Sequence, residues 1–379
     1  MRFNTVYIER SVRGSRVTSD ILSRNTYREK KIISSSSQMA ALWNFEQSIP
    51  SQKKNLLIAE NTGAFIKKCV RDKEKINKNE YLLYLFSGCP MDCQYCYLQD
   101  YLDIHIPVVF ANRGMFYDQA KVLLSSGEHI ILHAGEACDP FAMERISPYL
   151  EELIRFFIPW KKSCLEIRSK TIPPSSFYEC RGAPHILISQ TLSPEEDIRR
   201  FEKGTSGIAS RIQVLKRVRD TGFSIGLRFD PVIIRSKTLE SYAMLFERIF
   251  SILPPEDVAS VSLGALRFTK DLFRITRLRF PLSGLTASEW SLSQQKIKYF
   301  LPLRVKLYTG LVSLLKKYIK RDFSRRVSIC MDRELEKKIM EPHGLTSMAP
   351  WNPPSPCGLR ARSVQHRIPL CDISPKPET

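Results

Sequence analysis

The chain has 379 residues, 43% of them apolar, which is enough for one large domain with additions or for two domains with sizeable cores. It carries 58 Lys and Arg against 39 Asp and Glu, and the net charge of +19 fits either a solvated basic surface or a polyanionic partner. No apolar run approaches the ~18 residues of a membrane span, so the composition excludes a membrane-spanning protein.

Residues 1–78 are polar and charged, and we expect them to form an N-terminal extension. Within it, residues 11–20 and 33–38 are expected to be loops because they are rich in Ser and Gly, whereas residues 61–75 should begin a short ordered piece. The N-terminus lacks the apolar segment of a secretory signal, although its basic, Ser-rich composition also fits an organellar transit segment. We therefore expect an intracellular, cytoplasmic protein, in which cysteines bind metal, catalyse or pack more often than they pair.

Short apolar runs alternate with helix-like stretches through residues 79–290. This alternation predicts an α/β fold with a parallel sheet, either an incomplete (β/α) barrel or an open doubly wound sheet. The expected strands are 81–88, 129–136, 163–170, 185–192, 223–233 and 258–266, with helices at 148–158 and 208–222. Active sites in such folds lie at the C-terminal ends of the strands. The chemically reactive side chains that follow predicted strands are Cys89, Glu136, Lys170, Ser193 and Asp230.

Three cysteines follow the first predicted strand with the spacing C-x3-C-x2-C: Cys89, Cys93 and Cys96. Their polar neighbours argue against buried, inert thiols, and a disulfide would need an oxidising compartment. A structural zinc site would need a distant fourth ligand, for example His105 or Cys138. A [4Fe–4S] cluster usually takes four cysteines, so a cluster held by three would leave one iron with the open position that a catalytic metal needs.

This spacing after a strand, with an aromatic residue before the third cysteine, resembles the radical S-adenosylmethionine (SAM) superfamily. The segments 88–99 (GCPMDCQYCYLQ), 201–233 and 266–270 (LRFTK) are similar to the spore photoproduct lyase family, and the resemblance runs from about 80 to about 335. It implies an incomplete (β/α)6-type radical SAM barrel with N- and C-terminal extensions. It also implies a [4Fe–4S] cluster on the three cysteines and S-adenosylmethionine at the open iron, whose cleavage releases a 5′-deoxyadenosyl radical.

The resemblance further implies cofactor contacts. Gly135 and Glu136 would meet the cofactor amine, although Glu136 on its own would be an ordinary strand-end acid. Lys170 would lie near the cofactor carboxylate. The other implied contacts are Tyr95 on the adenine side and Ser193, with Ser189 also allowed by a one-residue difference in length.

Cys138 falls where the family has a cysteine that returns a hydrogen atom to the repaired thymine. A thymine radical remains once the lesion has lost a hydrogen and its bridging bond has broken, and a thiol can quench that radical. Tyr97 is the implied relay of a hydrogen between the thiyl and the cofactor. The alternative for Cys138 is a small buried hydrophobe, the commonest fate of a free cysteine. The sequence ACDPF replaces the family's Ala-Cys-Thr-Ser-Asp here, which bears on donor geometry and on substrate identity.

Residues 267–326 carry fifteen Lys or Arg against three acids, with aromatic residues between them. Positive charge for phosphates and flat rings for bases favour a nucleic-acid partner over a plain basic surface. A helix is expected at 310–323. Segment 296–308 falls where the lyase has a DNA-wedging hairpin, so Tyr299 and Arg304 are candidates for that role.

The predicted function is a radical SAM carbon–carbon lyase for DNA repair, which reverts 5-thyminyl-5,6-dihydrothymine to two thymines after the lesion is extruded from the duplex. The expected partners are lesion-bearing DNA and an electron donor such as flavodoxin or ferredoxin, with no membrane. Two alternatives stay open: a radical SAM enzyme of this family acting on another nucleic acid, and a non-catalytic iron–sulfur protein that binds nucleic acid. The predicted regions are the extension 1–78, the barrel 79–290, a basic DNA-binding region 291–344 and an irregular Pro-rich tail 345–379.

Overall fold

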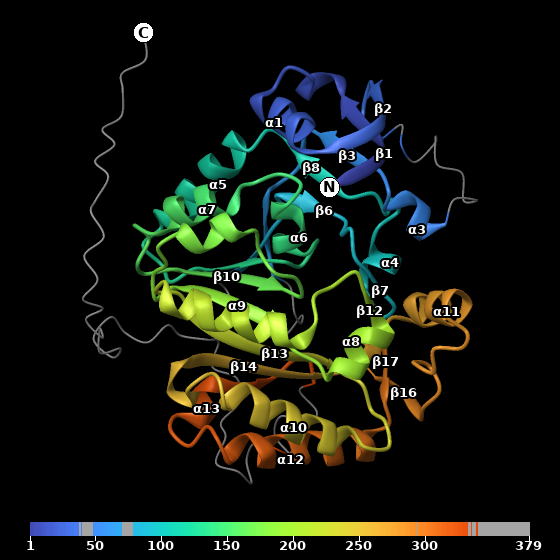
Figure 1. Ribbon diagram of the computed structural model, residues 1–379, viewed down its shortest axis with the longest axis vertical. Helices are drawn as coiled ribbons and strands as arrows, with labels where there is room; N and C mark the ends of the chain where they lie inside the picture. The colour runs from blue at the N-terminus through green and yellow to red at the C-terminus, as the bar shows by residue number, and fades with distance from the viewer. Residues whose placement is uncertain are drawn as a thin grey trace.

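The computed structural model describes residues 1–37, 48–69, 79–293 and 295–332, with Met39, Leu335 and Ile339 as single positions (Figure 1). The predicted tail 345–379 and part of the predicted ordered piece 61–75 lie outside the described residues. None of the helices in the described part of the chain has the length and apolarity to cross a bilayer.

An eight-stranded sheet forms the main body, in the order β18-β14-β13-β11-β10-β9-β5-β4. All neighbouring strands are parallel except β4 and β5, and the sheet keeps two open edges, as expected for an incomplete barrel. Five of the six predicted strands are confirmed as single strands. The strand predicted at 81–88 is wrong as one strand, because it divides into β5 of this sheet and β6 (Phe86–Ser87) of a second sheet. The strands β4 and β18 are additional. The strands are β4 (Ile66–Lys68), β5 (Glu80–Leu83), β9 (Ile131–Ala134), β10 (Cys164–Ser169), β11 (Ile186–Thr191), β13 (Ser224–Val232), β14 (Val258–Ala265) and β18 (Val327–Ile329).

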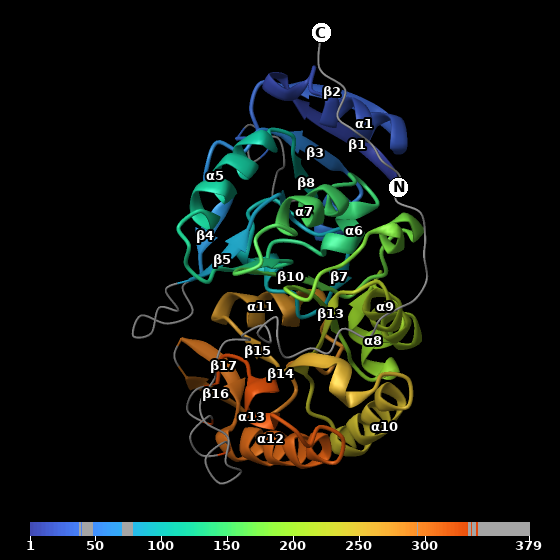
Figure 2. The same ribbon diagram turned by 90° about the vertical axis from the view of Figure 1, so that its left-hand side faces the viewer.

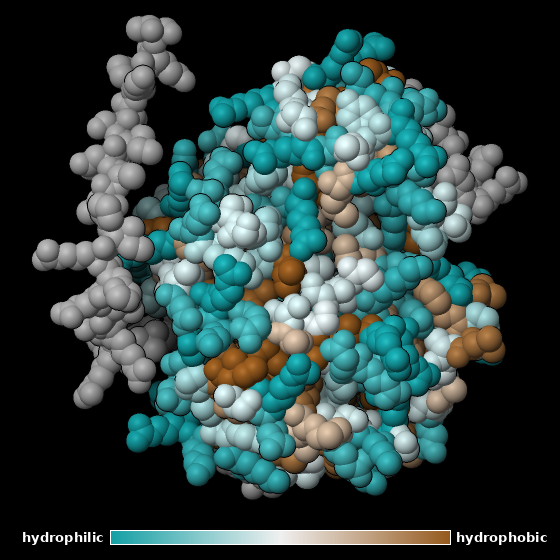
Figure 3. Space-filling view, in the orientation of Figure 1, coloured by the Kyte–Doolittle hydropathy of each residue, from teal (hydrophilic) through white to brown (hydrophobic). Residues whose placement is uncertain are grey.

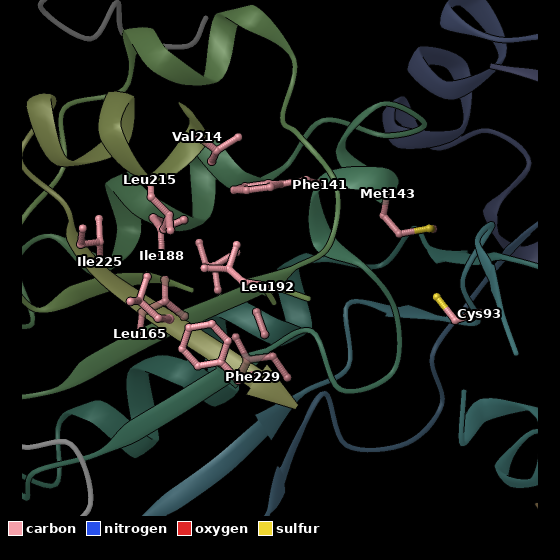
Figure 4. Packing of buried hydrophobic residues seen from close by; sticks show 14 of the residues in the cluster. Cys93, Phe141, Met143, Leu165, Ile188, Leu192, Val214, Leu215, Ile225 and Phe229 are labelled. Carbon is pink, nitrogen blue, oxygen red and sulfur yellow. The ribbon is translucent and has the colours of Figure 1, made fainter. Parts of the chain in front are cut away.

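Helices follow the strands and cover the sheet. Val214 and Leu215 of α9 lie over Ile188 of β11, so the helix buries its apolar side against the strands (Figure 4). The predicted helices at 148–158 and 208–222 are confirmed as α7 and α9. The helix expected at 310–323 is confirmed only in its first half: α12 begins nine residues earlier, where Pro302 suits a first turn, and ends at Lys316. The bounds are α5 (Gly114–Leu124), α6 (Pro140–Glu144), α7 (Leu150–Phe157), α8 (Glu195–Phe201), α9 (Ile208–Asp220), α10 (Thr238–Phe250), α12 (Leu301–Lys316) and α13 (Phe323–Arg326), with short 3-10 turns at Arg10–Val12, Ser175–Glu179 and Pro255–Asp257.

A second sheet, at the top of Figure 1, contains the N-terminal residues in the order β2-β1-β3-β8-β6. Its first two strands are parallel and are joined by α1, which begins after Ser15, whose hydroxyl accepts a hydrogen bond from the Thr18 amide at 3.1 Å. The loop predicted at 11–20 is therefore wrong over its second half, since Ser15 is a helix N-cap. The elements are β1 (Arg2–Glu9), α1 (Arg16–Arg24), β2 (Thr26–Ile33), α3 (Ile49–Gln52), β3 (Leu56–Ala59), β6 (Phe86–Ser87) and β8 (Val108–Phe110).

A three-stranded antiparallel sheet, β15 (Arg267–Phe268), β17 (Lys296–Tyr299) and β16 (Trp290–Ser293), lies beside α11 (Lys270–Arg279) (Figure 2). A hairpin is therefore present, but it ends at residue 299 and its predicted wedge residues are buried. Tyr299 is 1% exposed and stacks on Trp290, with 4.3 Å between ring centroids. Arg304 is 2% exposed and forms an ion pair with Asp332. Neither side chain can reach DNA in this arrangement, so the wedge assignment of Tyr299 and Arg304 is wrong.

Candidate active site

A cavity of about 530 Å³ lies at the C-terminal ends of the parallel strands, where the α/β pattern places an active site. It brings together side chains from many separate segments of the chain. Nine of the ten predicted site residues line it: Cys89, Cys93, Tyr95, Cys96, Tyr97, Gly135, Glu136, Cys138 and Lys170.

The cysteine loop, residues 88–107, leaves β6 and returns as β8, so both of its ends are strands of the N-terminal sheet. Gly88 begins the loop with φ of +74°, and a Cβ atom there would lie 2.5 Å from the Ile106 carbonyl oxygen. This close approach requires glycine, because any side chain would push the two ends of the loop apart.

Two clamps hold the loop against the main body. The short strand β7 (Asp92–Cys93) pairs antiparallel with β12 (Glu202–Lys203), and the Gln94 amide donates to the Phe201 carbonyl at 2.8 Å. On the other side, Arg279 of α11 donates to both carboxylate oxygens of Asp92, at 3.1 and 3.2 Å. The helix α4 (Leu98–Tyr101) continues the loop beyond the third cysteine. The loop is therefore positioned by residues about one hundred to two hundred positions away in sequence.

The three cysteines are free thiols on one cavity wall. Among the described residues, no three His, Cys, Asp or Glu side chains converge on a point where a single metal ion would fit. A [4Fe–4S] cluster takes each thiolate on a different iron, so its ligands need not converge, and the donor set fits that group. Burial raises the pKa of Cys89 to about 12 and that of Cys93 further, so these thiols stay protonated until a metal replaces the proton.

Lys170, directly after β10, joins a buried charged network. Its Nζ lies 2.7 Å from the Tyr95 hydroxyl and 3.6 Å from Glu202 Oε1, and Tyr95 donates to the same Glu202 oxygen. Arg211 of α9 binds Glu202 Oε2 at 2.5 Å. Burial alone raises the pKa of Glu202, but the two cations and the Tyr95 hydroxyl outweigh it and lower the pKa to about 2. The network fixes Lys170 and Tyr95 side by side at the cavity wall.

Gly135 and Glu136 form the turn after β9. Gly135 has φ of +118°, and a Cβ atom there would lie 2.5 Å from the Arg168 carbonyl oxygen, so the turn requires glycine. The Glu136 carboxylate accepts a hydrogen bond from Arg168 Nη1, and Arg168 Nε donates to Glu166 at 2.8 Å. Arg168 was not predictable as a site residue, because an arginine inside a strand pattern normally indicates the solvent face. Here it holds the Glu136 side chain at the cavity through this hydrogen bond.

Asp139, directly after Cys138, links the segment that follows β9 to the C-terminal end of β10. The carboxylate of Asp139 accepts hydrogen bonds from the Ser169 and Thr171 hydroxyls and from the Lys170 amide, each at 2.7 Å. Burial raises the pKa of Cys138 well above its ordinary value, which favours the neutral thiol. Tyr97 lines the same cavity and donates its hydroxyl to the Glu136 backbone carbonyl. The ACDPF sequence thus supplies an acid that fixes Cys138 relative to Lys170.

Neither predicted serine lines the cavity. The Ser193 hydroxyl donates to Glu202 Oε1 at 3.4 Å, and the Ser189 hydroxyl donates to Glu166 Oε1 at 2.8 Å, both in buried positions. The cavity residue contributed by β11 is Thr191, at the C-terminal end of the strand. Both serines therefore lie outside the cavity lining, Ser189 within β11 and Ser193 two residues after it, and their role as cofactor contacts stays a prediction.

Four charged side chains that were not predicted to bind the cofactor line the cavity on and after β13. Asp230 binds Arg267 at 3.0 Å and Arg228 at 3.6 Å. Lys296 of β17 extends toward Met331, with its Nζ 3.8 Å from the sulfur. Arg228, Arg267 and Lys296 around Asp230 thus form a cationic part of the cavity wall, whereas the cysteine loop contributes thiols to the same cavity.

Comparison with known proteins gives one family. The spore photoproduct lyase family model matches residues 6–323, so the match includes the N-terminal sheet, where the sequence analysis found no resemblance. The spore photoproduct lyase of Geobacillus sp. (strain Y412MC61) is 24% identical over 225 residues, which cover 58% of this chain and 65% of that protein. The enzyme of Bacillus subtilis (strain 168) is 23% identical over 215 residues, covering 55% and 63%. The chain thus spans less than two thirds of each of these relatives.

Solved structures show the same fold. Spore photoproduct lyase complexed with dinucleoside spore photoproduct has a TM-score of 0.74 at 18% identity, covering 86% of this chain and 98% of that one. A mutant of that enzyme with bound S-adenosylmethionine and dinucleoside spore photoproduct has a TM-score of 0.73 at 17% identity and the same coverage. Because the family match runs through most of the sequence, this chain belongs to the spore photoproduct lyase family.

Proposed function

We propose that this protein is a radical SAM DNA repair lyase, which reverts the spore photoproduct, 5-thyminyl-5,6-dihydrothymine, to two thymines. The observation that carries the proposal is one cavity at the strand ends that contains three free thiols in the cysteine loop together with Glu136, Lys170 and Cys138. Relatives in the same family carry the name of this activity, and one of them binds S-adenosylmethionine and the dinucleoside lesion.

Cys89, Cys93 and Cys96 would hold a [4Fe–4S] cluster, and Tyr95, Gly135, Glu136 and Lys170 would bind S-adenosylmethionine. When bound, the two groups supply a 5′-deoxyadenosyl radical. The carboxylate of Glu136 suits an amine, and the ammonium group of Lys170 suits a carboxylate.

The residues of the chain then control the fate of the substrate radical. Cys138 would give the hydrogen atom of its S–H bond to the thymine radical. This transfer would complete the methyl group of the repaired thymine and leave a thiyl radical on Cys138. Tyr97, which lines the same cavity, would relay a hydrogen atom between that thiyl and the cofactor: its hydroxyl would give a hydrogen atom to the sulfur, and the tyrosyl radical would regain one from the 5′-deoxyadenosine part of the cofactor. A one-electron donor such as flavodoxin or ferredoxin is the proposed protein partner, because cofactor cleavage requires one electron.

The experiment is a turnover assay on anaerobically reconstituted protein with reductant, S-adenosylmethionine and the dinucleotide photoproduct. We expect repaired thymine dinucleotide, detected by chromatography and mass spectrometry.

A second candidate, an enzyme of the same family acting on another nucleic-acid lesion, is favoured by Asp139 in the ACDPF sequence. If this second candidate is correct, the turnover assay should form 5′-deoxyadenosine but no repaired thymine. Protein that forms neither product would contradict both enzymatic proposals and favour a non-catalytic iron–sulfur protein.

We expect DNA binding through the cations of α11 that adjoin the cavity, because Thr269 and Leu272, at the start of this helix, line it. Lys298 and Arg304 are buried and pair with Asp332, which removes them from the predicted DNA contacts. The exposed cations of α11 are Lys270, Arg274 and Arg277. Most of the face in Figure 3 is hydrophilic, with an apolar patch over α11.

The triple variant Lys270→Ala, Arg274→Ala and Arg277→Ala should flatten the salt dependence of duplex affinity, because each lost phosphate contact lowers the slope of log K against log salt by about 0.9. Fluorescence anisotropy at several salt concentrations measures it. The matched control removes three exposed cations that follow the C-terminal end of α12, Lys317, Lys320 and Arg321. Equal effects of the two triple variants would show that α11 has no special role.

A further inference from the structure

Lys296 is a cation in the cavity with no acidic partner among the described residues. Its neighbours are neutralised: Arg267 binds Asp230 at 3.0 Å, and Lys298 lies 3.6 Å from Asp332. The contact recorded for the Lys296 Nζ is the Met331 sulfur at 3.8 Å. A sulfur atom is a weak acceptor, so the ammonium group keeps its capacity to bind an anion.

The register of β17 directs this side chain to the cavity. Alternate residues of a strand point to opposite faces, and Tyr299 of β17 packs its ring on Trp290. Lys296 and Lys298 therefore share the other face, and Lys296 lines the cavity. Burial, followed by Arg267 and Lys298, lowers the pKa of Lys296, so a bound anion would relieve an unfavourable concentration of positive charge.

We propose that Lys296 binds the phosphodiester group that links the two nucleosides of the substrate, so that the cavity selects a phosphodiester-linked dinucleotide over the unlinked dinucleoside. The inference rests on the proposed function and specifies its substrate. Lysine offers three donors and a charge but no acceptor, which suits a phosphate better than a thymine carbonyl. The cavity volume of about 530 Å³ falls within the range for ligand sites, and the cysteine loop and Lys296 both line it.

The test compares two substrates, the photoproduct with its phosphodiester and the dinucleoside photoproduct without it, on wild type, Lys296→Met and Lys296→Arg. Wild type should show a KM about tenfold lower for the linked substrate, as expected for one charge-assisted hydrogen bond. Lys296→Met should lose this preference, and Lys296→Arg should restore much of it. Inorganic phosphate added to the unlinked substrate shows whether any free phosphate can fill the subsite. Lys306→Met, an exposed lysine of α12, is the control and should keep the preference.

A wild type without preference, or a Lys296→Met protein that keeps it, would overturn the proposal. Equal weakening for both substrates would also overturn it, since that pattern indicates a structural lysine, and melting temperatures identify a folding defect. If wild type converts neither substrate, the proposed function fails separately. Calorimetric binding of thymidylyl-thymidine, an undamaged phosphodiester-linked dinucleotide, to wild type and Lys296→Met then still decides whether the phosphodiester subsite exists.

Discussion

Cys89→Ala protein should contain no stable iron–sulfur cluster and should have no lyase activity. Cys89, Cys93 and Cys96 line one cavity wall, and loss of one thiolate leaves two ligands for a group that normally takes three or four. Anaerobically prepared wild type should be brown and bind about four iron atoms per chain. Iron analysis and visible absorption test the prediction independently of turnover.

The control for this experiment is Cys180→Ala, because Cys180 is a half-buried thiol outside the cavity. It should keep its iron, its colour and its activity. Stoichiometric zinc in the native protein, or full cluster content in Cys89→Ala, would contradict the cluster assignment. The melting temperature of the apoprotein separates loss of a ligand from loss of the fold.

Cys138→Ala should change the products of the reaction rather than stop its first step. The cysteine loop, Glu136 and Lys170 remain, so hydrogen abstraction from the lesion should continue. The thymine radical should then persist until an external reagent quenches it, and the main products should change from clean thymine to adducts with that reagent. Mass spectrometry of the products measures the change.

Cys138→Ser serves as the matched variant, because its hydroxyl keeps the size and polarity of the side chain but is a poorer hydrogen-atom donor. It should give the same adducts as Cys138→Ala. A cysteine with a packing role alone would behave differently, since truncation would cost about 1 kcal/mol of stability and leave the products unchanged. Clean thymine from both variants would contradict the donor role.

The central parallel strands were predictable because they are short, rich in apolar residues and buried on both faces. All six residues of β10 and all six of β11 are buried, and such runs stand out between amphipathic helices. The strand β18 contains three residues, Val327–Ile329, directly after a basic stretch, and carries no comparable signal. The helix α1 depended on one N-cap hydroxyl, that of Ser15, within a segment whose composition indicated a loop.

The site was predictable where its residues are close in sequence and not where tertiary contacts define it. The cysteine spacing lies within eight consecutive residues. Arg211 is fully buried against Glu202, but a charged residue in an amphipathic helix normally indicates its solvent face. Basic and aromatic composition likewise could not reveal that Tyr299 and Arg304 point inward, because Trp290 and Asp332, their partners, come from other elements.

The cysteine loop connects β6 and β8, which pair with each other in the N-terminal sheet. Cys138 and Lys170, in contrast, follow strands of the other sheet. Ligand binding at the loop and folding of the N-terminal sheet are therefore linked equilibria. A ligand that orders the loop also stabilises β8 and, through β3, β1. The N-terminal unit contains neither Cys138 nor Lys170, yet its stability is thermodynamically linked to any metal cluster that the cysteine loop binds.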